Sequence, residues 1–221
     1  MNLDSRKGGV IASRFYALAF VGLSGILGMV SPPDLAMMTT QAQTTQDRKA
    51  EADRLINQGN QQYNISQFGA ALQSYQKALN IYREIKFRQG ELWGLGGTGR
   101  AYQSLGKYDK AIEYQLQSLE IAREIKDRLG EGAALGNLGN AYFSLGKYNK
   151  AIEFHLQRLT ISRDIKDLLG EEIALGNLGI AYFSLGKYDK AIEYQLQSLA
   201  ISREIKNRRG EGASLGNLGN A

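Results

Sequence analysis

A repeat of forty residues constrains the fold of this chain more than any other feature. The copies follow one another without gaps, and three of them are nearly identical. They are residues 50–89, 90–129, 130–169, 170–209 and a partial copy over 210–221. A fixed period of this size indicates an architecture of stacked repeats, in which each unit packs mainly against its neighbours. We therefore expect a single array over residues 50–221.

Each copy contains two amphipathic segments. In the copy over 130–169 they run from about Glu131 to Leu145 and from about Tyr148 to Leu168, with apolar residues at steps of three and four. These steps fit helices rather than strands. Gly146 separates the two segments, and glycine readily adopts the left-handed conformation that ends a helix. Each copy is thus predicted to be a helical hairpin that buries its apolar faces only by stacking.

The first segment carries a pattern that resembles the tetratricopeptide repeat. In the copy over 130–169 the pattern is Leu135-x2-Leu138-Gly139-x2-Tyr142, followed by Ala151. The resemblance implies an all-α fold, a right-handed superhelical solenoid of helix-turn-helix repeats. Units of forty residues with Leu-Gly-Asn are similar to the LGN and kinesin-light-chain type and to bacterial arrays. The family repeat has 34 residues, and we expect the six extra residues to lengthen the second helix.

Polar and aromatic side chains recur along one face of the first segments. In the family this face lines a concave groove, where asparagines hold the backbone of an extended peptide. The resemblance assigns that role to Asn137, Asn140, Ser144, Asn177, Ser184 and Asn217, with Phe143 and Phe183 forming apolar pockets beside them. An amide both donates and accepts hydrogen bonds, so it can pair with a peptide group. The alternative is that these asparagines pair with neighbouring helices inside the stack.

Charge and composition argue against several other functions. The net charge is +5, but both signs are interspersed along the helices, so no nucleic acid is expected. The chain has no cysteine and one histidine, and we predict no metal site, no cofactor and no enzymatic activity. Gln115 and Gln195 stand at the positions equivalent to His155, which is therefore expected on the helix surface. Trp93 is expected to be a packing residue, with a ligand-stacking anchor as the alternative.

The first 42 residues differ from the array. A basic start precedes an uncharged run over residues 15–30, and Ser31-Pro32-Pro33 follows. This order is typical of a secretory signal, with cleavage expected after Ala42, and an uncleaved membrane anchor through residues 15–30 is the alternative. Either reading places the array outside the cytoplasm, as an exported or anchored protein. Residues 43–49 are expected to form a flexible lead-in.

The predicted function is a scaffold for protein–protein interaction that binds peptide segments in the concave groove. One alternative is that the array is the N-terminal recruiting part of a longer signalling protein, or of a multidomain protein with a caspase-like CHAT protease domain. Another is self-association through the open last repeat, where Leu215 and Leu218 lack a covering helix.

Overall fold

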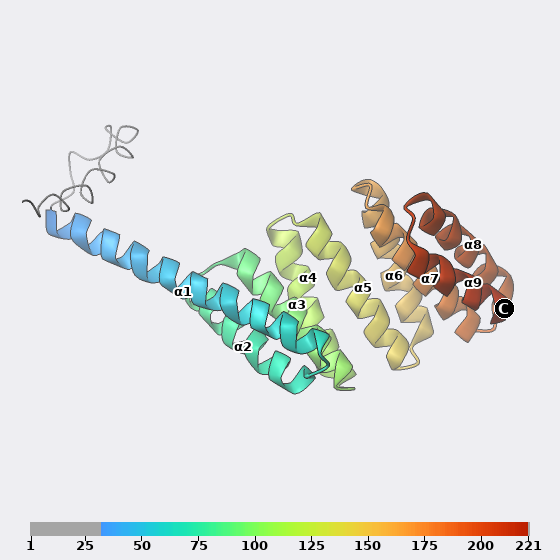
Figure 1. Ribbon diagram of the computed structural model, residues 1–221, viewed down its shortest axis with the longest axis horizontal. Helices are drawn as coiled ribbons and strands as arrows, with labels where there is room; N and C mark the ends of the chain where they lie inside the picture. Colours follow the sequence, from blue (N-terminus) through green and yellow to red (C-terminus); the bar gives the residue numbers. More distant parts are fainter. Residues whose placement is uncertain (1–31, 221) are drawn as a thin grey trace, which may run out of the picture. The chain divides into compact units, whose positions relative to one another are not determined.

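The computed structural model describes residues 32–220 of the chain, and all its regular elements in that range are helices (Figure 1). The expected signal or anchor lies largely outside the described residues. Among residues 32–220, no helix combines the length and the apolar character that crossing a membrane requires. The helices are α1 (Pro32–Asn64), α2 (Phe68–Glu84), α3 (Arg88–Ser104), α4 (Tyr108–Glu124), α5 (Arg128–Ser144), α6 (Tyr148–Asp164), α7 (Leu168–Ser184), α8 (Tyr188–Glu204) and α9 (Arg208–Asn220).

The chain divides into two compact units, one ending at Thr44 and the other running from Thr45 to the end. Within the described residues, the first unit consists of the helical residues 32–44, and the second is the array. Residues 43–49, expected to be a flexible lead-in, are instead helical and belong to α1. The polar Gln and Thr side chains there suggested a linker, but such residues also tolerate a solvent-exposed helix.

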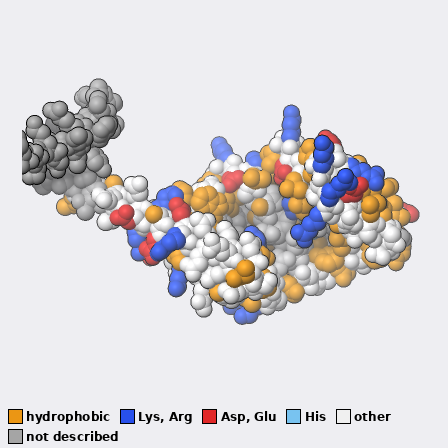
Figure 2. All heavy atoms as spheres, viewed as in Figure 1, with side chains coloured by type: hydrophobic (Ala, Val, Ile, Leu, Met, Phe, Trp, Pro, Cys, Tyr) orange, Lys and Arg blue, Asp and Glu red, His pale blue; other side chains and the backbone are white. Residues whose placement is uncertain are grey.

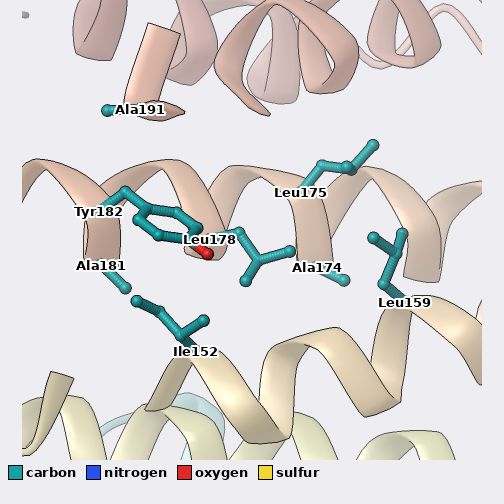
Figure 3. Packing of buried hydrophobic residues seen from close by; sticks show 8 residues of the cluster. All are labelled: Ile152, Leu159, Ala174, Leu175, Leu178, Ala181, Tyr182 and Ala191. Atoms are coloured by element: carbon teal, nitrogen blue, oxygen red, sulfur yellow. The ribbon is translucent and has the colours of Figure 1, made fainter. Parts of the chain in front are cut away.

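The helices of the array pack in chain order. Each one from α2 to α8 contacts the next, and α3, α5, α7 and α9 also contact one another in succession. This is the stacking of helical hairpins that the repeat predicted. Figure 3 shows one interface, where the apolar faces of α6, α7 and α8 meet. The buried cluster there consists of Ile152, Leu159, Ala174, Leu175, Leu178, Ala181, Tyr182 and Ala191.

The second helix of each unit is shorter than the sequence suggested. α4 and α6 end at Glu124 and Asp164, and every helix from α2 to α8 has 17 residues. The two helices of each unit from α3 to α8 are therefore equally long, and α6 does not continue to Leu168 as expected. Ile165 follows the apolar pattern but ends α6, and Lys166 after it has a left-handed φ of 57°. Gly146 has a φ of 71° in the other turn of the unit, so both turns use the same conformation.

Replacing the turn lysines by glycine is expected to stabilise the array. Lys126 and Lys166 have φ values of 59° and 57°, a region that costs a residue with a Cβ about 1–2 kcal/mol. Glycine removes that cost but gives the unfolded chain more freedom, so each substitution should add about 0.5–1 kcal/mol to the unfolding free energy. Urea unfolding of Lys126→Gly and Lys166→Gly measures the gain. Gly146→Ala, the reverse change in the other turn, should lower the unfolding free energy. A loss of stability in the lysine variants together with a gain in Gly146→Ala would contradict the assigned conformation.

Ion pairs join successive units on the surface. In α4, α6 and α8, the Nε atom of an arginine near the end of the helix lies 2.7–2.9 Å from Oε1 of a glutamate in the following helix. The pairs are Arg123–Glu131, Arg163–Glu171 and Arg203–Glu211. Pairs with one exposed partner contribute little each, at most about 1 kcal/mol. They do show that many of the interspersed charges are used between repeats.

Candidate functional site

A large hollow with a volume of about 540 Å³ lies between α3 and α5. That volume falls within the range of about 300–1,000 Å³ that is usual for ligand sites. Trp93, Gly97 and Arg100 of α3 line it on one side, and Ala133 and Asn137 of α5 on the other. Figure 2 shows a hollowed region on one face of the array, with hydrophobic and charged side chains around it.

Small residues border this hollow. Gly97 stands where the next two units have Asn137 and Asn177, and the ring of Tyr75 fills the space that a side chain there would occupy. Ser118 of α4 contributes a short side chain to the same hollow. Residues that differ between the repeats therefore line the hollow, at positions that the uniform pattern did not single out.

Trp93 packs against other aromatic side chains, as expected, and stays partly exposed. Its ring packs edge-on against Tyr82 and Phe87, with centroid distances of 6.4 and 6.1 Å. The residue nevertheless remains 45% exposed and borders the hollow. A large aromatic side chain held by two other rings offers a ligand a rigid apolar surface at little entropic cost.

The predicted asparagine stripe divides into two groups. Asn137 lines the large hollow, and among residues 32–220 its side chain has no hydrogen-bond partner. Asn177 instead donates from Nδ2 to Oδ1 of Asn140 at 3.2 Å, which joins α7 to α5. The hydroxyls of Ser144 and Ser184 donate to carbonyls of their own helices, at Asn140 and Ile180. Asn140 and Asn177 therefore make the contact between neighbouring helices that was considered as the alternative to peptide binding.

The remaining predicted residues lie further along the array. Phe183 and Asn217 line a smaller hollow of about 80 Å³ together with Gln195, so the structure brings these two together. Phe143 packs against Tyr148, with a centroid distance of 5.2 Å, and lines neither hollow.

His155 is not on the helix surface; it is 1% exposed. Gln115 and Gln195 are buried at the equivalent positions, where their amides donate to the carbonyls of Gly96 and Gly176 at 3.0 and 2.9 Å. The Nδ1 atom of His155 has no partner among the described residues. Its burial, together with the positive charge of Arg158, lowers the pKa of His155 to about 4.

A spacing within the repeat reveals why His155 is buried. It follows Ala151 by four residues, so both lie on one helix face, and Ala151 is fully buried. The imidazole packs against Gly139, where a Cβ would lie 2.5 Å from its Cε1 atom. Gly139 thus leaves room for the side chain of His155.

Arg158 borders a small hollow, and the sequence pattern did not point to it. It stands where the neighbouring units have Ser118 and Ser198, and Ser118 borders the large hollow. Between α5 and α6, Arg158 lines a hollow of only about 60 Å³, which shares Leu129 and Ala133 with the large one. Arg158 belongs to the second helix of its unit, whereas the site residues expected from the sequence all lie on first helices.

The chain belongs to the tetratricopeptide repeat family. The model of this family matches residues 54–124, 93–164 and 171–221. A comparison with curated protein sequences gives no match. Proteins of this repeat type are scaffolds for protein–protein interaction. Among residues 32–220, no group of acidic, histidine or cysteine side chains has a metal-binding arrangement.

Solved structures confirm the fold. Aspartyl phosphate phosphatase F from Bacillus subtilis matches with a TM-score of 0.72 and 21% identity, over 76% of this chain and 44% of that one. A Rap protein complexed with Competence and Sporulation Factor gives 0.71 and 22%, over 75% and 46%. Nearly identical repeats of a putative kinesin light chain from Podosopora anserina give 0.64 and 19%, over 77% and 84%. The chain thus spans less than half the length of the first two proteins.

Proposed function

We propose that the array binds a peptide segment of a partner protein along the face formed by α1, α3, α5 and α7. The large hollow between α3 and α5 is the observation that carries this proposal. It combines an apolar wall at Trp93 with polar groups at Arg100 and Asn137, the mixture that ligand sites generally show. The Rap structure, which contains Competence and Sporulation Factor, supports the proposal by analogy of fold.

Within this proposal the predicted residues have different roles. The amide of Asn137 is available for a backbone group of the peptide, as the family resemblance implies. Phe183 and Asn217 form a second contact region at the smaller hollow. Asn140 and Asn177 hold α5 against α7, so they shape the groove and reach the ligand only if their mutual hydrogen bond is exchanged. Ser144 and Ser184 are exposed and lie at the margin of the same face.

A peptide-display selection against the full chain tests the proposal. Trp93 is the only tryptophan of the chain, so its fluorescence reports binding at the large hollow for selected peptides that lack tryptophan. Ala133→Arg places a long side chain at the wall of the hollow, and we expect it to weaken binding at least roughly tenfold, or about 1.4 kcal/mol. Ala200→Arg on the exposed surface of α8 is the matched control and should bind normally. Selected peptides that bind both variants equally would place the binding surface elsewhere.

A further inference from the structure

Arg158 is a largely buried cation that makes no direct ion pair among residues 32–220. Among residues 32–220 its guanidinium makes no ion pair within 4.0 Å and no hydrogen bond. Burial lowers the pKa of Arg158, while the carboxylate of Asp167 acts in the opposite direction from a greater distance. A guanidinium has five N–H donors, and leaving a buried charge unpaired is unfavourable. The unliganded array therefore contains a local electrostatic cost that a bound anion would relieve.

The backbone of α5 makes room for this cation. A Cβ on Gly136 would lie 2.5 Å from the Nη1 atom of Arg158, so the guanidinium rests against the glycine. In the units before and after, the equivalent of Arg158 is serine and the glycine is retained. The glycine is thus common to the repeats, and Arg158 alone uses the space to bring a charge to the groove.

Arg158 lies next to the proposed peptide site. Its hollow of about 60 Å³ has two lining residues, Leu129 and Ala133, in common with the large hollow between α3 and α5. Asp167 also lines the smaller hollow, but one of its carboxylate oxygens already accepts from the backbone N–H of Gly170 at 2.9 Å. A peptide side chain that reaches beyond the large hollow would therefore meet a guanidinium with unused donors.

We propose that Arg158 is the subsite for a carboxylate of the bound peptide, an Asp or Glu side chain adjacent to the segment held between α3 and α5. This inference rests on the proposed peptide-binding function and specifies its ligand as an acidic peptide. A carboxylate pairs with a guanidinium through two parallel hydrogen bonds, which supplies both affinity and direction. The bound carboxylate provides the direct ion pair that Arg158 does not make with the described residues, where Asp167 acts only from a greater distance.

The single histidine allows the subsite to be tested directly. His155 precedes Arg158 by one helical turn and senses its charge, so its imidazole NMR signal reports events at the guanidinium. The full chain is titrated with N-acetylglutamic acid α-amide and, as the uncharged counterpart, N-acetylglutamine amide. We expect a saturable shift of the His155 signal with the glutamic acid probe and binding roughly tenfold or more weaker with the glutamine probe.

Two substitutions separate a binding role from a structural one. Arg158→Ser restores the residue of the neighbouring units and should abolish the response to the acidic probe without lowering the melting temperature. Arg158→Lys retains the charge and should keep part of the response. Arg54→Ser, at an exposed arginine of α1, is the control and should respond normally.

Three outcomes would overturn the carboxylate subsite: equal responses to both probes, an unchanged response in Arg158→Ser, or no saturable response up to the solubility limit of the acidic probe. Each leaves the proposed function open to its own test, because peptides selected on the groove would then bind without a preference for acidic residues. A melting temperature that falls in Arg158→Ser, with binding unchanged, would assign Arg158 to packing alone.

Discussion

Acidification toward pH 4 is expected to remove about 3 kcal/mol of unfolding free energy through His155 alone. Burial of the imidazole, and secondarily the charge of Arg158, lowers its pKa from 6.5 to about 4 in the folded chain. Each unit of pKa difference corresponds to about 1.4 kcal/mol. The side chain is 1% exposed, so solvent screening reduces this figure only modestly.

The sign follows from which state binds the proton first. The unfolded chain takes up a proton on His155 as the pH falls through 6.5, whereas the folded chain resists protonation until about pH 4. The unfolded state therefore binds more protons throughout this window, and stability declines as the pH falls. The stability contributed by neutral His155 is complete above pH 6.5, the pKa of this side chain in the unfolded chain. It is lost as the pH falls to about 4, its pKa in the folded chain.

Urea unfolding across this pH range measures the effect, and His155→Gln isolates it. Glutamine is the residue that the neighbouring units use at this position, where its amide donates to a glycine carbonyl. It does not titrate, so the variant should keep its stability where the wild type loses it. Carboxylates with lowered pKa values, such as Asp53, add their own loss at low pH equally in both proteins. Parallel pH profiles for the two proteins would contradict the burial of His155.

Much of the fold follows from the repeat itself. The period, the apolar steps and Gly146 together indicated hairpins of two helices, and the structure has them with the core at Leu175 and Leu178. The predicted end of the second helix, near Leu168, was wrong. Ile165 extends the apolar pattern by one step beyond Asp164, where α6 ends. A local pattern does not reveal that a lysine will adopt a left-handed conformation in place of glycine.

The candidate site was less accessible to sequence reasoning. A repeat pattern shows what the units share, whereas the lining of the large hollow includes positions at which they differ, such as Gly97 and Tyr75. Arg158 likewise lies on a second helix, and its guanidinium packs against Gly136 of the first helix. This contact becomes visible only when the two helices of the hairpin are packed. The spacing of the asparagines did not indicate that Asn140 and Asn177 are joined to each other.

Two neighbouring glycines of α3 should respond oppositely to alanine. Gly97→Ala is expected to destabilise the array by about 2 kcal/mol, an overpacking cost that exceeds the gain in helix propensity. Its Cβ would lie 2.7 Å from the Cδ1 atom of Tyr75, whose ring is 1% exposed. The ring has no room to retreat, because Gly59 of α1 is equally close on another side and the hydroxyl donates to Asn60 at 2.8 Å.

Gly96→Ala provides the matched control, because it makes the same change one residue earlier in the same helix. A Cβ there meets only the hydroxyl of Ser118, at an ordinary 3.7 Å. This variant should therefore gain up to about 1 kcal/mol from helix propensity. Thermal unfolding should show Gly97→Ala melting about 4–8 °C below the wild type and Gly96→Ala at or above it. If both variants were stabilised, Tyr75 would not be held between α1 and α3, and the wall of the large hollow would need a different explanation.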